Sequence, residues 1–216
     1  MIRAIIFDLD GVICFTDKYH YLAWKAIADQ LGVHFDEIIN HRLRGVSRLE
    51  SLNVILERYD GTLGMDQKQT LMDQKNTEYR SYLARMSPAD LHPDTLRTLK
   101  VLRARGYLLA IGSVSKNTPY ILERLGLSDF FDAVSDGNGL INSKPDPEVF
   151  LKASERLGIP PESCLVVEDA VAGIEAARHA GMVAVSLGDA STKGAGDYCL
   201  DRFDQLLDIL PLNNQM

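Results

Sequence analysis

The chain has 216 residues, of which 46% are hydrophobic and 25% charged, and this composition suits a globular enzyme of one domain with an insertion, or of two small domains. Its formal net charge of −7 and isoelectric point near 5.2 argue against broad electrostatic binding to nucleic acid or anionic lipid. An anionic substrate would therefore need basic residues that are gathered locally.

Apolar periodicity predicts an α/β core. Short apolar runs bounded by polar residues or glycine predict buried parallel strands, at residues 4–7, 107–112, 164–167 and 182–187. Apolar residues at helical spacing, each series closing on a glycine, predict helices at residues 93–106, 117–126, 146–158 and 170–181. We therefore expect a Rossmann-like, doubly wound parallel sheet with helices on both faces.

Residues 15–87 interrupt this alternation. Three helical patterns follow one another there without a convincing strand between them, at residues 17–32, 47–59 and 66–86. Ser47 and Glu50 have the S-x-x-E spacing of a capping box, which predicts that a helix begins at Arg48. The expected organisation is a discontinuous α/β core domain, residues 1–14 and 88–216, with an inserted all-helical cap domain, residues 15–87.

Two aspartates follow the first predicted strand at once, in the sequence AIIFDLDGV. Side chains two residues apart on a strand point the same way, so Asp8 and Asp10 should project together from its carboxyl end, where open α/β sheets bind ligands. Two close carboxylates repel unless a cation lies between them or one takes a proton. They could instead simply solvate a strand end and a turn begun at Gly11, but a pair that ends a hydrophobic strand favours a site.

Further polar residues occur at later strand ends, namely Ser113, Lys144, and Glu168 with Asp169. Magnesium prefers oxygen ligands and commonly takes one or two carboxylates plus substrate phosphate, so Asp8, Asp169 and a phosphate oxygen form a plausible shell. Taken singly, the serine could cap a helix, the lysine could be a solvated loop charge, and the two acids could begin a helix. Their coincidence at strand ends favours a functional site.

Four stretches, DLDGV, the serine of IGSVSKN, the lysine of SKPDPEVF, and VVEDAVAGIEAA, resemble in order and spacing the motifs of the haloacid dehalogenase superfamily, over nearly the whole chain. The resemblance implies that Asp8 is a nucleophile that forms an aspartyl phosphate, while Asp10 exchanges the proton of the leaving or attacking oxygen. It implies that Ser113 and Lys144 hold the transferring phosphoryl group. It also implies a Mg²⁺ site, with Asp8, the backbone carbonyl of Asp10, Glu168 and Asp169 as its ligands.

The insertion adds a resemblance to one family within this superfamily, the β-phosphoglucomutases. The segment HRLRGVSRLESL is similar to their R/K-G-V-S-R cap loop, which implies that Arg48 binds the phosphate that is not being transferred; a planar guanidinium suits that task. Thr16 matches a hinge threonine of that family, although it could equally cap a helix. The other implied substrate-binding residues are Gly45, Val46, Ser47, His20 and Lys75 in the insertion, and Ser115, Lys116 and Asn117 in the core.

Some of these residues have simpler interpretations. Arg48 could be a solvated residue of a first helical turn, although an arginine there opposes the helix dipole. His20 could be an ordinary packed histidine, and Trp24 is expected in the core rather than against a sugar.

The resemblance implies interconversion of β-D-glucose 1-phosphate and D-glucose 6-phosphate through β-D-glucose 1,6-bisphosphate, which would also prime Asp8. Phe15, Val114 and Asp94 depart from the family pattern and leave room for another sugar preference. A sugar phosphate phosphatase that uses the same aspartate is therefore the first alternative. A non-catalytic sugar phosphate binding protein is the second, and the intact set of motif residues speaks against it.

The cysteines and the apolar runs bear on where the protein works. Cys14, Cys164 and Cys199 form no C-x-x-C pair and are odd in number, so free thiols in a reducing cytosol fit best. The first apolar run is cut by Asp8 and Asp10, unlike a cleavable signal, and no later run approaches the ~18 apolar residues of a membrane span. We expect a monomeric cytoplasmic enzyme that acts on a small-molecule sugar phosphate, with neither nucleic acid nor membrane as a partner.

Overall fold

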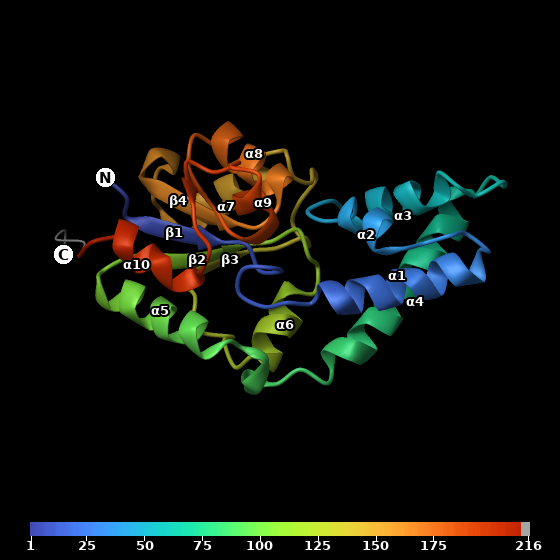
Figure 1. Cartoon of the computed structure of the whole chain (residues 1–216), viewed down its shortest axis with the longest axis horizontal. Coiled ribbons are helices and arrows are strands. Elements are labelled where there is room, and N and C mark those ends of the chain that lie inside the picture. The colour runs from blue at the N-terminus through green and yellow to red at the C-terminus, as the bar shows by residue number, and fades with distance from the viewer. Residues whose placement is uncertain (213–216) are drawn as a thin grey trace. The chain divides into compact units, whose positions relative to one another are not determined.

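The computed structural model describes residues 1–212 and divides into two compact units (Figure 1). Met1–Phe15 and the chain from Ser87 onward form the first unit, and Thr16–Met86 form the second. The division falls one residue inside the expected limits of the cap at each end. The first unit contains the sheet and is called the α/β unit below; the second is called the helical unit.

A single parallel sheet of six strands forms the centre of the α/β unit, in the order β3-β2-β1-β4-β5-β6. The strands are β1 (Ala4–Phe7), β2 (Leu108–Gly112), β3 (Ala133–Ser135), β4 (Cys164–Glu168), β5 (Val183–Ser186) and β6 (Tyr198–Cys199). The order runs outward from β1 in one direction and then from β4 in the other, so the predicted doubly wound topology is confirmed. The four predicted strands are present, while β3 and β6 were not predicted.

Helices cover both faces of this sheet. One face is packed by α7 (Glu148–Leu157), against β1, β2 and β3, and by α8 (Val171–His179), against β4 and β5. The opposite face carries α5 (Pro93–Ala104) together with α10 (Leu206–Ile209) (Figure 1). The remaining elements of the unit are α6 (Thr118–Arg124), α9 (Gly188–Thr192) and the short 3₁₀ turns η1 (Pro88–Asp90), η2 (Pro161–Ser163) and η3 (Phe203–Gln205).

The apolar core between sheet and helices explains why these segments fold as they do. Buried strand residues such as Ile6 and Val166 pack with Phe150 of α7 and Ile174 of α8 in one cluster. Strands covered on both faces need continuous apolar runs, which is the pattern that the sequence shows. The site residues described below therefore extend from a rigid scaffold.

The helical unit consists of α1 (Asp17–Gln30), α2 (Glu37–His41), α3 (Arg48–Leu56) and α4 (Met65–Leu83). Its core includes Trp24, as predicted, together with Phe35, Leu52 and Leu71. The predicted capping box is confirmed: the Ser47 hydroxyl accepts from the Glu50 backbone N–H at 3.2 Å, and the Glu50 carboxylate accepts from the Ser47 backbone N–H at 2.8 Å. The short helix α2 was not predicted.

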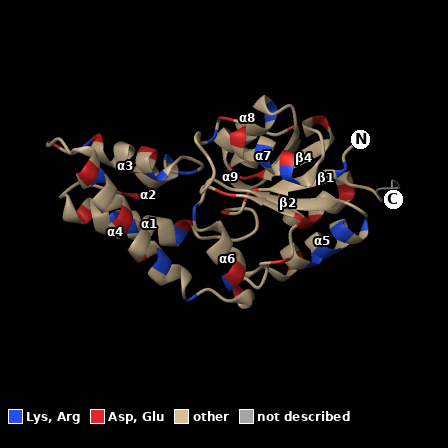
Figure 2. Ribbon diagram, turned by 180° about the vertical axis from the view of Figure 1, so that it is seen from behind, with Lys and Arg blue, Asp and Glu red and all other residues tan. Residues whose placement is uncertain are grey.

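Charged residues of both signs are interspersed along the helices of both units (Figure 2). Several form exposed ion pairs within one helix, such as Lys25 with Asp29 at 2.8 Å. Pairs of this kind stabilise a protein by only ~0.2–1 kcal/mol. Within residues 1–212, no helix combines the length and the apolar character that a membrane span requires. The three cysteines are free thiols, as predicted.

Candidate active site

The aspartate after β1 and the glutamate that ends β4 lie on neighbouring strands. Phe7 of β1 pairs in register with Val167 of β4, and the Asp8 backbone N–H donates to the Val167 carbonyl at 2.9 Å. Glu168 is therefore next to Asp8 across the sheet. Successive strands are added on one side of β1 up to β3 and on its other side from β4 onward, so β1 and β4 flank a topological switch point. Open α/β sheets bind ligands at such a point, beyond the carboxyl ends of the strands.

Lys144 joins these two carboxylates. The predicted place of Lys144 at a strand end is wrong, because the residue lies in the loop between β3 and α7, well after β3 ends at Ser135. Its Nζ nevertheless reaches the strand ends and donates to Asp8 Oδ1 at 2.5 Å and to Glu168 Oε2 at 2.7 Å. Its Nζ also lies over the ring of the buried Phe150, 4.9 Å from the ring centroid. Lys144 is only 2% exposed, which excludes the interpretation as a solvated loop charge.

Three carboxylates, those of Asp8, Glu168 and Asp169, each bring an oxygen to within 4.8 Å of the others. Room for them depends on two glycines: a Cβ at Gly11 would overlap the Asp169 carboxylate, and a Cβ at Gly173 would overlap that of Glu168. Gly11 also has φ of +90°, a conformation that other residues rarely adopt. The carboxylate of Asp10, which follows in the turn after β1, is not a member of this cluster. Helix α8 begins only at Val171, so Glu168 belongs to the strand end and not to a helix start.

The electrostatics of the cluster follow from its burial. Burial raises the pKa of Asp8, and the Glu168 charge raises it further, to about 7, against the lowering effect of Lys144. Burial likewise raises the pKa of Glu168. Burial alone would lower the pKa of Lys144, but the two carboxylates outweigh it and raise that pKa above its ordinary value. Lys144 is therefore a permanent cation, and it is outnumbered by the carboxylates around it.

Ser113 follows β2, the strand on the other side of β1, and its backbone N–H donates to the Ser135 carbonyl at 3.0 Å. Its hydroxyl accepts from the Ser115 backbone N–H at 3.2 Å, and the Ser115 hydroxyl accepts from the Asn117 N–H at 3.2 Å. These bonds fold residues 113–117 into a tight loop, in which Lys116 is exposed. Helix α6 begins at Thr118, so Ser113 is not its cap.

Comparisons with known proteins identify relatives of this chain. The family model described as haloacid dehalogenase-like hydrolase matches residues 2–181. The chain belongs to this family. It is 43% identical over 192 residues to "Beta-phosphoglucomutase" of Bacillus subtilis, covering 86% of this chain and 83% of that protein. It is 33% identical to "Fructose-1-phosphate phosphatase YqaB" of Escherichia coli, covering 85% of this chain and 95% of that one.

A solved structure of another family member has the same fold. It is the crystal structure of β-phosphoglucomutase (pgmB) from Clostridium difficile, with a TM-score of 0.90 and 36% identity, covering 95% of this chain and 93% of that one. The family thus includes relatives named as mutases and relatives named as phosphatases.

Arg48 is the first residue of α3 in the helical unit, directly after the N-cap residue Ser47. Its guanidinium is half-buried and donates through Nη2 to Asn76 Oδ1 at 2.9 Å. Burial lowers the pKa of Arg48 from its ordinary value. The preceding residues Gly45, Val46 and Ser47 form the turn that leads into the helix, and none of them is fully buried. A side chain held in this way differs from a freely solvated first-turn arginine.

A second group in the helical unit links α1 to α4. The Lys75 ammonium lies 2.9 Å from His20 Nδ1, and also 4.4 Å from the centre of the Tyr79 ring and 5.1 Å from that of Trp24. Because an ammonium group only donates, Nδ1 accepts and the His20 ring carries its proton on Nε2. Burial, followed by the charges of Lys75 and Arg48, lowers the pKa of His20 well below its usual value, so the ring is neutral.

Thr16, the first residue of the helical unit, is the partner of Tyr79. It occupies the N-cap position of α1, but its side chain makes no capping hydrogen bond; instead Thr16 Oγ1 accepts from the Tyr79 hydroxyl at 3.0 Å. Sequence reasoning missed Tyr79, although its position four residues after Lys75 on one helix face could have indicated it. It also missed Phe150 beneath Lys144.

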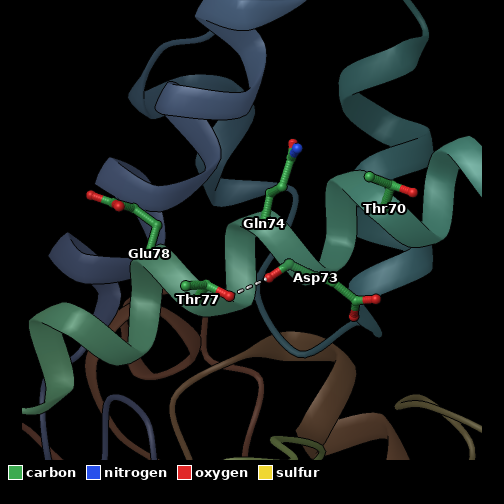
Figure 3. Close-up of a pocket in the computed structure, with 5 residues that line it drawn as sticks. All are labelled: Thr70, Asp73, Gln74, Thr77 and Glu78. Carbon is green, nitrogen blue, oxygen red and sulfur yellow. Dashed lines mark hydrogen bonds between the residues drawn. The ribbon is translucent and has the colours of Figure 1, made fainter.

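One surface hollow lies on α4, lined by Thr70, Asp73, Gln74, Thr77 and Glu78 (Figure 3). Its side chains are neutral or acidic, and the Thr77 hydroxyl donates to the Asp73 carbonyl at 3.0 Å. An anionic substrate needs basic groups, so this hollow is a poor candidate for the site.

Proposed function

We propose that this protein interconverts β-D-glucose 1-phosphate and D-glucose 6-phosphate through an aspartyl-phosphate enzyme and β-D-glucose 1,6-bisphosphate. One observation carries the proposal: the buried contact of Lys144 with Asp8 occurs in a chain that is 43% identical to a relative named β-phosphoglucomutase. The cap-loop resemblance at Arg48 supports the same choice.

Asp8 is assigned as the nucleophile. With the 1,6-bisphosphate as donor, an Asp8 oxygen forms a bond to the phosphorus at C1 while the bond from that phosphorus to the sugar oxygen breaks; Asp10 gives its proton to this oxygen and glucose 6-phosphate leaves. In the other step Asp10 removes the proton of the 6-hydroxyl of glucose 1-phosphate, which attacks the aspartyl phosphate, regenerates the bisphosphate and frees Asp8. Lys144 and Ser113 hold the phosphoryl oxygens, because phosphoryl transfer depends mostly on positioning and charge neutralisation.

The acidic cluster fits a divalent cation. The cluster holds three carboxylates and one ammonium group, so a divalent cation would balance the two negative charges that remain when all three carboxylates are ionised. Their oxygen donors are the ligands that Mg²⁺ prefers. We assign the site to Asp8, Glu168, Asp169 and the backbone carbonyl of Asp10. When bound, the metal would neutralise charge on the phosphoryl group and favour the ionised form of Asp8.

We assign recognition of the phosphate that is not transferred to Arg48, with help from Ser115, Lys116 and Asn117 of the loop after β2. Arginine can hold a phosphate with two parallel hydrogen bonds and so fix its orientation. His20, as a neutral Nε2–H donor, and Lys75 are proposed as further substrate contacts, beside Gly45, Val46 and Ser47. Thr16 is proposed as a hinge residue. The free thiols of the chain fit a cytoplasmic enzyme, which we propose to be a monomer.

The test is ³¹P NMR of the purified protein with Mg²⁺, β-D-glucose 1-phosphate and a trace of the 1,6-bisphosphate. Glucose 6-phosphate should accumulate far faster than inorganic phosphate, and chelation of the metal by EDTA should stop the reaction. Dominant release of inorganic phosphate would instead establish a sugar phosphate phosphatase. The 33% identity to a fructose-1-phosphate phosphatase makes that the second candidate, and fructose 1-phosphate is the substrate to test beside glucose 1-phosphate.

A further inference from the structure

Lys144 lies within a long loop, residues 136–147, yet its ammonium group is placed against two buried carboxylates. A lysine side chain is flexible, and a loop backbone adds further freedom. Something must therefore fix the backbone of this loop. Side-chain packing contributes little near Lys144: Leu140 is partly buried against the core cluster, but Ile141, nearer to Lys144, is 91% exposed.

The loop is tied instead to the first turn of α7 by one carboxylate. Glu148 Oε2 accepts from the backbone N–H of Asn142 at 2.7 Å and from that of Ile141 at 3.0 Å. Its Oε1 accepts from Lys152, one helical turn later, at 2.5 Å, and Lys152 also donates to the Gly139 carbonyl. Glu148, with Lys152, thus attaches residues 139–142 by hydrogen bonds to α7, which packs on the sheet.

A second tie follows Lys144 on its other side. The Pro145 carbonyl accepts from His179 Nδ1 of α8 at 3.0 Å, and the Asp146 carboxylate accepts from the Glu148 backbone N–H at 2.9 Å. The backbone of Lys144 is therefore held from both sides. Hydrogen bonds from Lys152 and from the Asn142 N–H lower the pKa of Glu148 to about 2, so its carboxylate is ionised across the working range of an enzyme.

We propose that Glu148 is a positioning residue for phosphoryl transfer: it fixes residues 139–142 to α7 and so places Lys144 beside Asp8. Glu148 touches neither Asp8 nor the phosphoryl group, and it acts only through the lysine. The inference rests on the proposed function for its kinetic consequence, but the placement of Lys144 can be measured without any turnover.

The kinetic experiment uses hydrolysis of acetyl phosphate, which needs Asp8 and Lys144 but no sugar. Glu148→Ala should lower kcat about 10- to 100-fold with little change in KM, the usual cost of disturbing a supporting residue or of displacing a reacting group by about 1 Å. Glu148→Gln keeps an acceptor oxygen and should lie between Glu148→Ala and the wild type. Asp132→Ala is the matched control, because Asp132 also accepts from a backbone N–H, that of Leu109 at 2.7 Å, and from a cation, Arg103 at 2.9 Å.

The second readout is acylation of Lys144 by an N-hydroxysuccinimide ester, followed by peptide mass spectrometry. Lys144 should be protected in the wild type and in Asp132→Ala, and should react at least about tenfold faster in Glu148→Ala, with the exposed Lys100 as internal reference. If the wild type transfers no phosphoryl group but Lys144 loses protection in Glu148→Ala, the positioning role stands and the proposed function fails. Unchanged protection, or a kinetic loss shared equally by Asp132→Ala, would overturn the inference.

Discussion

Replacing Lys144 by methionine tests whether this lysine is the counter-charge of the buried carboxylates. Methionine retains an unbranched apolar stem but removes the ammonium group, which donates at 2.5 Å to Asp8 and at 2.7 Å to Glu168. Asp8 is 6% exposed and Glu168 only 1%, so neither can recover its hydration. Breaking a buried ion pair from one side costs about 3–5 kcal/mol of unfolding free energy, and we expect a loss of that size at pH 8.

The loss of unfolding free energy in Lys144→Met should be larger at high pH than at low pH. Without the ammonium group, the folded-state pKa values of Asp8 and Glu168 rise further above their unfolded values. A carboxyl group with a raised pKa stabilises the fold when protonated, and this contribution is lost as pH rises through the folded pKa. The deficit of Lys144→Met relative to the wild type should therefore shrink between pH 8 and pH 5.

Urea denaturation followed by far-UV circular dichroism, with EDTA present, measures both quantities. Lys100→Met is the control, because Lys100 is an exposed lysine of the same unit and its replacement should change stability by less than about 0.5 kcal/mol. A deficit below about 1 kcal/mol at pH 8, or one that stays constant down to pH 5, would show that Lys144 does not neutralise this cluster.

Three further predictions address the proposed roles. Asp8→Asn should form no aspartyl phosphate in ³²P or mass-spectrometric trapping, while calorimetric binding of sugar phosphate persists; measurable turnover would refute the nucleophile assignment. Arg48→Ala should lower kcat/KM for glucose 1-phosphate about 10- to 100-fold, the worth of one charge-assisted hydrogen bond, but leave acetyl phosphate hydrolysis nearly unchanged. The control Arg42→Ala removes an exposed arginine of the same segment and should lower neither kcat/KM for glucose 1-phosphate nor the rate of acetyl phosphate hydrolysis. Equal losses on both substrates in Arg48→Ala would exclude a distal phosphate role for Arg48. His20→Gln should make the stability of the helical unit less sensitive to acid. Because the pKa of His20 is lowered in the folded state, the wild type loses stability as pH falls below about 6.5, the usual pKa of histidine. The urea midpoint, measured by Trp24 fluorescence, should therefore fall less in the variant than in the wild type between pH 8 and pH 5. Parallel pH profiles would contradict a buried neutral His20.

Much of the fold follows from the sequence because its main strands and helices have clear periods. The exceptions are short: β3 has three residues, β6 has two, α2 and α9 have five each, and α10 has four. A pattern needs several residues to repeat, so elements of this length leave no periodic signal, and their formation depends on neighbours such as β2 and β5.

In the candidate site, too, some features could be predicted from the sequence and others could not. Parallel strands end at one edge of a sheet, so the presence of Asp8 and Glu168 at that edge could be expected from the sequence, in which each follows a predicted strand. The contact of Lys144 with both could not, because it depends on the path of a loop between β3 and α7. The bond between Tyr79 and Thr16 joins residues far apart in the chain and depends on how α1 packs against α4.

Gly11 and Gly173 show that the site also depends on positions that have no side chain. Each glycine leaves a space the size of one methyl group, and a carboxylate occupies it. Alanine at either position would leave every acid, lysine and serine of the chain in place, yet it would push Asp169 or Glu168 out of position. A relative with a complete set of charged motif residues can thus still be inactive, and a search for non-functional members of the family should examine these two positions as closely as the aspartates themselves.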